Sequence, residues 1–97
     1  MIDLHATFEK YDGEFLKFDR IPPPRKAHTR PDLCAFLLLD RLIPGTRDMV
    51  AGAEHDEIWL DVDLEALAAA ATEDDILTLV RCGVRLDGDA GSLAMFV

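Results

Sequence analysis

The sequence predicts an α+β fold, in which a small mixed or antiparallel sheet carries two to three helices on one face. Two segments, one near each end of the chain, are typical of β-hairpins. At 56–62, every second residue from Ile58 to Val62 is aliphatic, which indicates a central strand with one buried face between them. Residue pairs typical of helix N-termini precede the remaining apolar runs. The chain has 97 residues, so we expect residues 1–97 to form a single domain.

The first predicted hairpin covers residues 4–21 and turns at Asp12-Gly13, a dipeptide favoured in tight turns. A longer loop at this turn would place apolar against apolar and acidic against basic residues across the two strands: Phe8 against Phe18, and Glu9 against Lys17. A two-residue loop agrees better with the turn dipeptide but pairs apolar with charged side chains. We favour the longer loop, because a one-residue slip would turn charges toward the core.

A helix is predicted over residues 33–43, after a basic and proline-rich connection. Pro22-Pro23-Pro24 ends the preceding strand, because proline cannot donate to a sheet. Thr29 and Asp32 have the spacing of a capping box. The helix is apolar on nearly all sides, so we expect it to be central in the fold or covered by a partner chain.

Residues 45–55 are expected to form a loop with weak helical character. The strand at 56–62 follows, with its apolar residues Ile58, Leu60 and Val62 on one side and Glu57, Trp59 and Asp61 on the other. Asp63 then caps a short helix, and a second capping box, Thr72 with Asp75, opens another helix that ends at Gly83. One continuous helix over 63–82 is the alternative.

The second predicted hairpin joins residues 84–87 to residues 92–97 through a turn at 88–91. Its last strand is apolar on both faces, with Leu93, Met95 and Val97 on one side and Ala94 and Phe96 on the other. A strand of this kind belongs in the middle of a sheet. Cys34 and Cys82 both lie in apolar segments, so we expect two buried, reduced thiols and not a disulfide.

The charge is divided unevenly along the chain, whose net charge is −9. Residues 1–47 carry eight Lys/Arg and seven Asp/Glu, whereas residues 48–97 carry two Arg and twelve Asp/Glu. An acidic surface repels nucleic-acid phosphates and anionic lipid and attracts basic protein surfaces. The first residues have neither a basic start nor an apolar run, so we expect a cytoplasmic protein without membrane association.

Trp59 is the most specific candidate for a binding residue. It lies between Glu57 and Asp61 on the polar side of its strand, and tryptophan is enriched at the centres of protein interfaces. These three residues therefore define a candidate interface. The alternative is that a helix of the same chain packs over this side and buries the indole.

Two further groups of residues suggest other classes of function. The connection at 20–30 holds the only basic patch, which could contact nucleic acid; its members are Arg20, Arg25, Lys26, His28 and Arg30. The acidic half could instead mimic DNA. Asp61 and Asp63, at the end of a strand, could hold a divalent cation for a metal-dependent enzyme.

No arrangement of nucleophile, base and supporting acid has a recognisable spacing in this chain. The function we expect is therefore that of a small acidic interaction module without catalysis of its own, which binds a protein partner and forms a homodimer. We expect no cofactor and no bound metal. The nucleic-acid regulator and the metal-dependent enzyme are the two alternatives.

Overall fold

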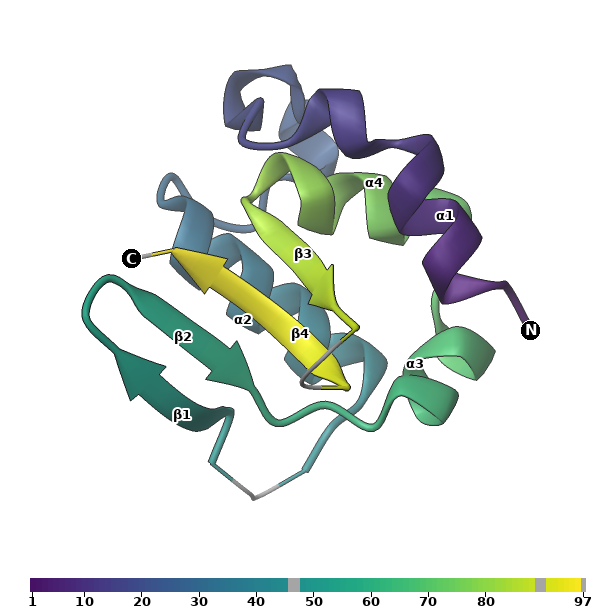
Figure 1. Cartoon of the computed structure of the whole chain (residues 1–97). Helices are drawn as coiled ribbons and strands as arrows, with labels where there is room; N and C mark the ends of the chain where they lie inside the picture. The colour runs from purple at the N-terminus through teal and green to yellow at the C-terminus, as the bar shows by residue number, and fades with distance from the viewer. Residues whose placement is uncertain (46–47, 89–90, 97) are drawn as a thin grey trace.

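A computed structural model describes residues 1–45, 48–88 and 91–96 of the chain (Figure 1). The described residues form an α+β fold, as predicted. Its helices are α1 (Leu4–Lys10), α2 (Pro31–Leu42), α3 (Leu64–Ala70) and α4 (Glu73–Arg81), and its strands are β1 (Val50–Glu54), β2 (Glu57–Leu60), β3 (Val84–Asp87) and β4 (Ser92–Phe96). Three single turns of 3₁₀ helix, η1 (Asp12–Glu14), η2 (Phe18–Arg20) and η3 (Pro23–Arg25), lie between α1 and α2.

The four strands form one antiparallel sheet with the order β1-β2-β4-β3. Two hairpins, β1–β2 and β3–β4, build this sheet, and β2 and β4 are its inner strands. The predicted central strand and the predicted inner position of the last strand are both confirmed. Asp89, Ala90 and Val97, which the sequence placed in the turn and at the end of the last strand, lie outside the described residues.

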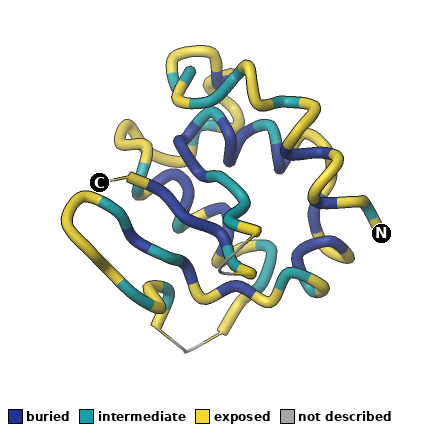
Figure 2. The backbone as a smooth tube through the Cα atoms, in the orientation of Figure 1, coloured by how far each residue is buried: buried dark blue, intermediate teal, exposed yellow. Residues whose placement is uncertain are grey.

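One face of the sheet contacts the helices and forms the core. In Figure 1 helix α2 passes behind β2 and β4, and α4 and α1 lie beside β3. The strand residues that point to this side are buried (Figure 2): Ile58, Leu60, Val84, Leu93 and Met95. They pack with the buried residues of α2 and α4 in one continuous hydrophobic cluster. No helix among the described residues is long and apolar enough to cross a membrane.

The N-terminal hairpin predicted at 4–21 is wrong, because these residues form α1 and the turns η1 and η2. Asp3 caps α1 by accepting a hydrogen bond from the amide of Ala6 at 3.1 Å. Leu4 and Phe8, one helical turn apart, are buried on the same side of this helix. Glu9 does not face Lys17; it lies 3.8 Å from His5 on its own helix.

The first hairpin of the sheet instead lies within 50–60, partly where the sequence predicted a loop. Strand β1 pairs with β2 through a tight turn at His55-Asp56, where His55 has a φ of 52°. The register shifts between Val50 and Gly52, which is the signature of a β-bulge. Ala51, Gly52 and Ala53 have little tendency to form a strand alone, so pairing with β2 determines the structure of this segment.

Residues 63–82 form two short helices, α3 and α4, as predicted, and not the alternative of one continuous helix. Asp63 caps α3 by accepting from the amides of Glu65 and Ala66, and Thr72 with Asp75 forms the predicted capping box of α4. Gly83 follows α4 with a φ of +96°, as a C-terminal glycine should. A Cβ at this position would also lie 2.6 Å from Cδ2 of Leu16, so the exposed Leu16 side chain would have to shift.

Helix α2 begins at Pro31 without a side-chain cap, so the predicted capping box of Thr29 and Asp32 does not form. Cys34, Ala35, Leu38 and Leu39 are buried, which places this helix on the core. Leu33 and Leu37 are exposed on the opposite side, where Leu37 keeps 49% of its accessible surface. The helix therefore carries more apolar side chains than the core buries.

The two cysteines are free and buried, as expected, and the fold brings their side chains together at the interface of α2 and the end of α4. Burial raises the pKa of the Cys82 thiol well above its usual range, and the hydrogen bond with Cys34 raises it further. A thiol with such a high pKa stays protonated and is a poor nucleophile.

Truncation of Phe8 is expected to lower the free energy of unfolding by about 3–5 kcal/mol, because the side chain is buried between α1 and the core. Leu37→Ala should lower it by less than about 1 kcal/mol, because half of that side chain is already in water. Urea unfolding of the two variants measures both values. Equal losses would contradict the observed position of α1 and α2.

Thiol labelling of the native protein is expected to be slow at neutral pH, because Cys34 and Cys82 are both buried and Cys82 is held in its protonated form. After unfolding in urea, both thiols should react at the rate of free cysteine. Labelling of the native chain that is as fast as labelling of the unfolded chain would show that the α2–α4 interface opens readily.

Candidate interaction face of the sheet

The second face of the sheet carries no helix among the described residues. In Figure 1 this is the face toward the viewer, and β2, β4 and β3 lie open on it. By strand alternation it presents Glu57, Trp59, Arg85, Asp87, Ala94 and Phe96. We call these six residues the open face. No helix among the described residues covers Trp59, so the alternative of an indole buried under a helix is not observed.

Trp59 lies along the open face between two very small neighbours. Its cross-strand partners are Gly52 on β1 and Ala94 on β4. A Cβ on Gly52 would lie 3.8 Å from Cε3 of the indole, and the indole Nε1 donates a hydrogen bond to Asp87 of β3 at 3.0 Å. The ring therefore spans the face from β1 to β3, and Ala94 beneath it is fully buried.

Arg85 makes a second bridge across the same strands. Its guanidinium pairs with the carboxylate of Glu57 on β2 and lies 4.5 Å from the ring centroid of Phe96 on β4. Stacking of an arginine on an aromatic ring orients the guanidinium and leaves its edge available for acceptors. One nitrogen, Nη1, is buried without a hydrogen-bond partner among the described residues.

The open face therefore combines two aromatic rings with charges of both signs. Trp59 is partly exposed, and Phe96 keeps 51% of its accessible surface. Both rings are held by specific contacts to neighbouring strands, so little conformational freedom would be lost on binding. Tryptophan and arginine are the residue types that most often dominate the binding energy of protein interfaces.

The third predicted interface residue, Asp61, lies just beyond β2 and is exposed. Its amide donates to the carbonyl of Met49 at 2.7 Å, which extends the pairing of the first hairpin. Asp63 uses one carboxylate oxygen to cap α3, at 3.0 and 3.2 Å from two amides. Within 1–45, 48–88 and 91–96, no group of three or more His, Cys, Asp or Glu side chains is placed to hold a metal ion.

The predicted basic patch does not form one continuous cationic surface, because its arginines meet carboxylates of the same chain. The contacts are Arg20 with Glu14 at 2.7 Å, Arg25 with Asp74 and Asp75 at 3.5 Å, and Arg30 with Asp32 at 3.2 Å. Lys26 lies over the ring of Phe18, and Nδ1 of His28 accepts from the amide of Arg30. This pairing lowers the net positive charge available to a phosphate backbone.

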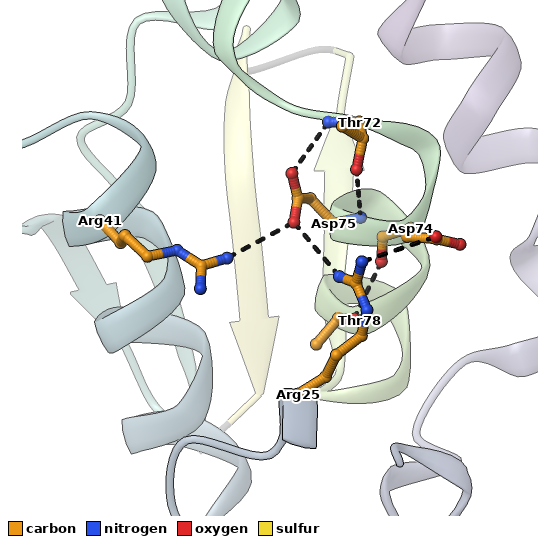
Figure 3. A network of polar contacts seen from close by, with 6 residues as sticks. All are labelled: Arg25, Arg41, Thr72, Asp74, Asp75 and Thr78. Atoms are coloured by element: carbon orange, nitrogen blue, oxygen red, sulfur yellow. Dashed lines mark hydrogen bonds and ion pairs between the residues drawn. The ribbon is translucent and has the colours of Figure 1, made fainter. Parts of the chain in front are cut away.

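Asp75 is the centre of the largest of these polar networks (Figure 3). One of its oxygens accepts from the Thr72 amide at 2.9 Å, and the other lies 3.5 Å from Arg25 and 3.6 Å from Arg41. The carboxylate is buried, so the two arginines compensate a charge that has little access to water. They join the basic segment and α2 to the start of α4.

Glu14 is the matching polar contact at the other end of α4. Its carboxylate accepts from Arg81 at 2.9 Å and pairs with Arg20 at 2.7 Å. The hydrogen bond from Arg81 and the charge of the two guanidiniums hold the pKa of Glu14 below its ordinary value. In the same way, Lys10 lowers the pKa of Glu73 at the start of α4.

Sequence reasoning identified Trp59 and Glu57 but missed Arg85, Asp87 and Phe96 as their partners on the open face. The signal was present in the second hairpin, where Arg85 and Asp87 alternate with Val84 and Leu86. Their contacts with β2 depend on the sheet order, in which β4 lies between β2 and β3. In comparisons with protein-family models, curated proteins and solved structures, no match to this chain was found.

Glu14→Gln is expected to destabilise the protein at neutral pH and to have less effect in acid. The pKa of Glu14 is lowered in the folded state, so its contribution is present above its unfolded pKa and is lost as pH falls through the folded pKa. Urea unfolding at about pH 7 and about pH 3 measures the difference between variant and parent. Glu65→Gln, at an exposed position of α3, is the control and should show a small, constant difference.

Proposed function

We propose that this chain is a small interaction module without catalysis of its own, and that it pairs with a second copy of itself through the open face. The observation that carries this proposal is the uncovered sheet face with Trp59 and Phe96 on it. Two sheets pack well face to face when their exposed side chains interdigitate. A second sheet would bury both rings and remove them from water.

The charges of the open face support a copy of the same chain as the partner. The face holds Arg85 beside Glu57 and Asp87, so it carries both signs within a short distance. In a two-fold symmetric contact each residue of one patch meets the other residues of the same patch. Arg85 of one copy can then approach a carboxylate of the other, whereas the strongly acidic start of α4 stays outside the contact.

The exposed leucines of α2, Leu33 and Leu37, form the competing surface, but that helix holds no tryptophan.

Size-exclusion chromatography with light scattering, over a range of protein concentration and salt, tests the pairing. We expect a mass that rises from the 10.8 kDa of one chain toward twice that value as concentration increases. Phe96→Glu should shift the equilibrium to the monomer, because it places a charge among the buried rings. Leu37→Ala, a surface change on the far side of the molecule, is the matched control and should leave the dimer intact.

Trp59→Ala is the second variant, with thermal unfolding measured beside it because the substitution also removes the hydrogen bond to Asp87. A folded Trp59→Ala chain should be monomeric. A mass of one chain at every concentration would refute self-association. A dimer lost in Leu37→Ala but kept in Phe96→Glu would move the interface to α2.

A further inference from the structure

A groove separates α1 from β3, the edge strand of the sheet. It has a volume of about 500 Å³, within the range of ordinary binding sites. Its apolar lining comes from four different segments: Phe8 of α1, Phe15 after η1, Val80 of α4, and Val84 and Leu86 of β3. This site lies at the opposite edge of the sheet from β1, and Arg85 is the one open-face residue that also lines it.

Among the strands that the structure describes, β3 pairs with β4 alone. In an antiparallel edge strand, alternate N–H and C=O groups point away from the sheet and can pair with another strand. No backbone hydrogen bond joins Val84, Arg85 or Leu86 to any described residue other than those of β4. The groove therefore runs beside backbone groups of β3 that pair with no second strand among the described residues.

The polar rim of the groove is acidic. Glu9 and Asp12 line it from the α1 side, together with His5. Neither carboxylate pairs with a Lys or Arg among the described residues, whereas the nearby Glu14 pairs with two arginines. Arg85, the cation on the opposite rim, is already neutralised by Glu57. The rim therefore retains uncompensated negative charge next to the free strand edge.

We infer that this groove docks an extended, basic segment of a partner protein, which adds a strand to β3. Main-chain hydrogen bonds to β3 would supply affinity, as in other cases of strand addition. One apolar side chain of the segment would enter between Phe8 and Phe15, and a Lys or Arg beside it would face Glu9 and Asp12. Charge argues against a second copy here, because each copy carries −9 and the same two acids.

The probe is a short synthetic peptide in which Val and Leu alternate with Lys and Arg, labelled for fluorescence polarisation. A peptide of the same pattern with Glu in place of each basic residue is the charge control. We expect the basic peptide to bind more weakly as salt is added, and the acidic one not to bind. Backbone amide NMR should place the changes at Val84, Arg85 and Leu86 and leave β1 unchanged.

Two matched double variants separate the groove from general attraction to an acidic protein. Glu9→Gln with Asp12→Asn removes the rim charges and should weaken binding about tenfold. Asp40→Asn with Glu65→Gln removes the same charge from exposed positions on α2 and α3 and should change affinity less than about twofold. Both proteins are expected to fold, because all four side chains are exposed.

Equal weakening by the two double variants would overturn the inference, and so would amide changes confined to the open-face residues of β2 and β4. Amide changes at β3 that grow with protein concentration alone would assign the edge to a second copy instead. Because the dimer test uses Phe96→Glu and Trp59→Ala, failure of the dimer and failure of peptide docking give separate results.

Discussion

Helix α4 is the constraint on which the rest of the structure depends. It contacts α1, α2, β3 and the turns η1 and η2, so segments far apart in the sequence meet on it. Its two ends are fastened by ion pairs: Asp75 meets Arg25 and Arg41 at the N-terminal end, and Arg81 meets Glu14 at the C-terminal end. Between them the apolar residues Ile76, Leu79 and Val80 are buried. The first thirty residues contain no strand, and these contacts give them a defined place.

Because the helices gather on one side, the other side of the sheet is covered by its own side chains. The neighbours of Trp59 are Gly52 and Ala94, and this small size lets an indole lie along the strands. The contacts of Trp59 with Asp87 and of Arg85 with Glu57 both cross β4 and restrain the position of the three strands. The same contacts that stabilise the sheet also hold the aromatic groups rigid at the surface, which suits a binding role.

The elements that were predicted correctly have strong local signals. The residues at 57–60 alternate between the two faces of the sheet, and α3 and α4 each begin directly after a capping residue. The strand predicted at residues 4–10 was wrong because the spacing of Leu4 and Phe8 fits both a strand and one helical turn. The signal for a helix is Asp3, which caps α1. Strand β1 was not predicted because its small residues have little strand tendency of their own and become a strand by pairing with β2. The open face was only half predicted, since partners on separate strands depend on sheet order, which alternation does not reveal.

The bulge between Val50 and Gly52 distinguishes the two edges of the sheet. A bulged edge twists away and interrupts the regular spacing that another strand would need, whereas β3 has a regular register along its length. A fibril that grows by strand addition requires two competent edges on every molecule. With one regular edge, edge-to-edge contacts end after a single step. The folded chain thus keeps one strand edge accessible while its other edge is a poorer template for strand addition.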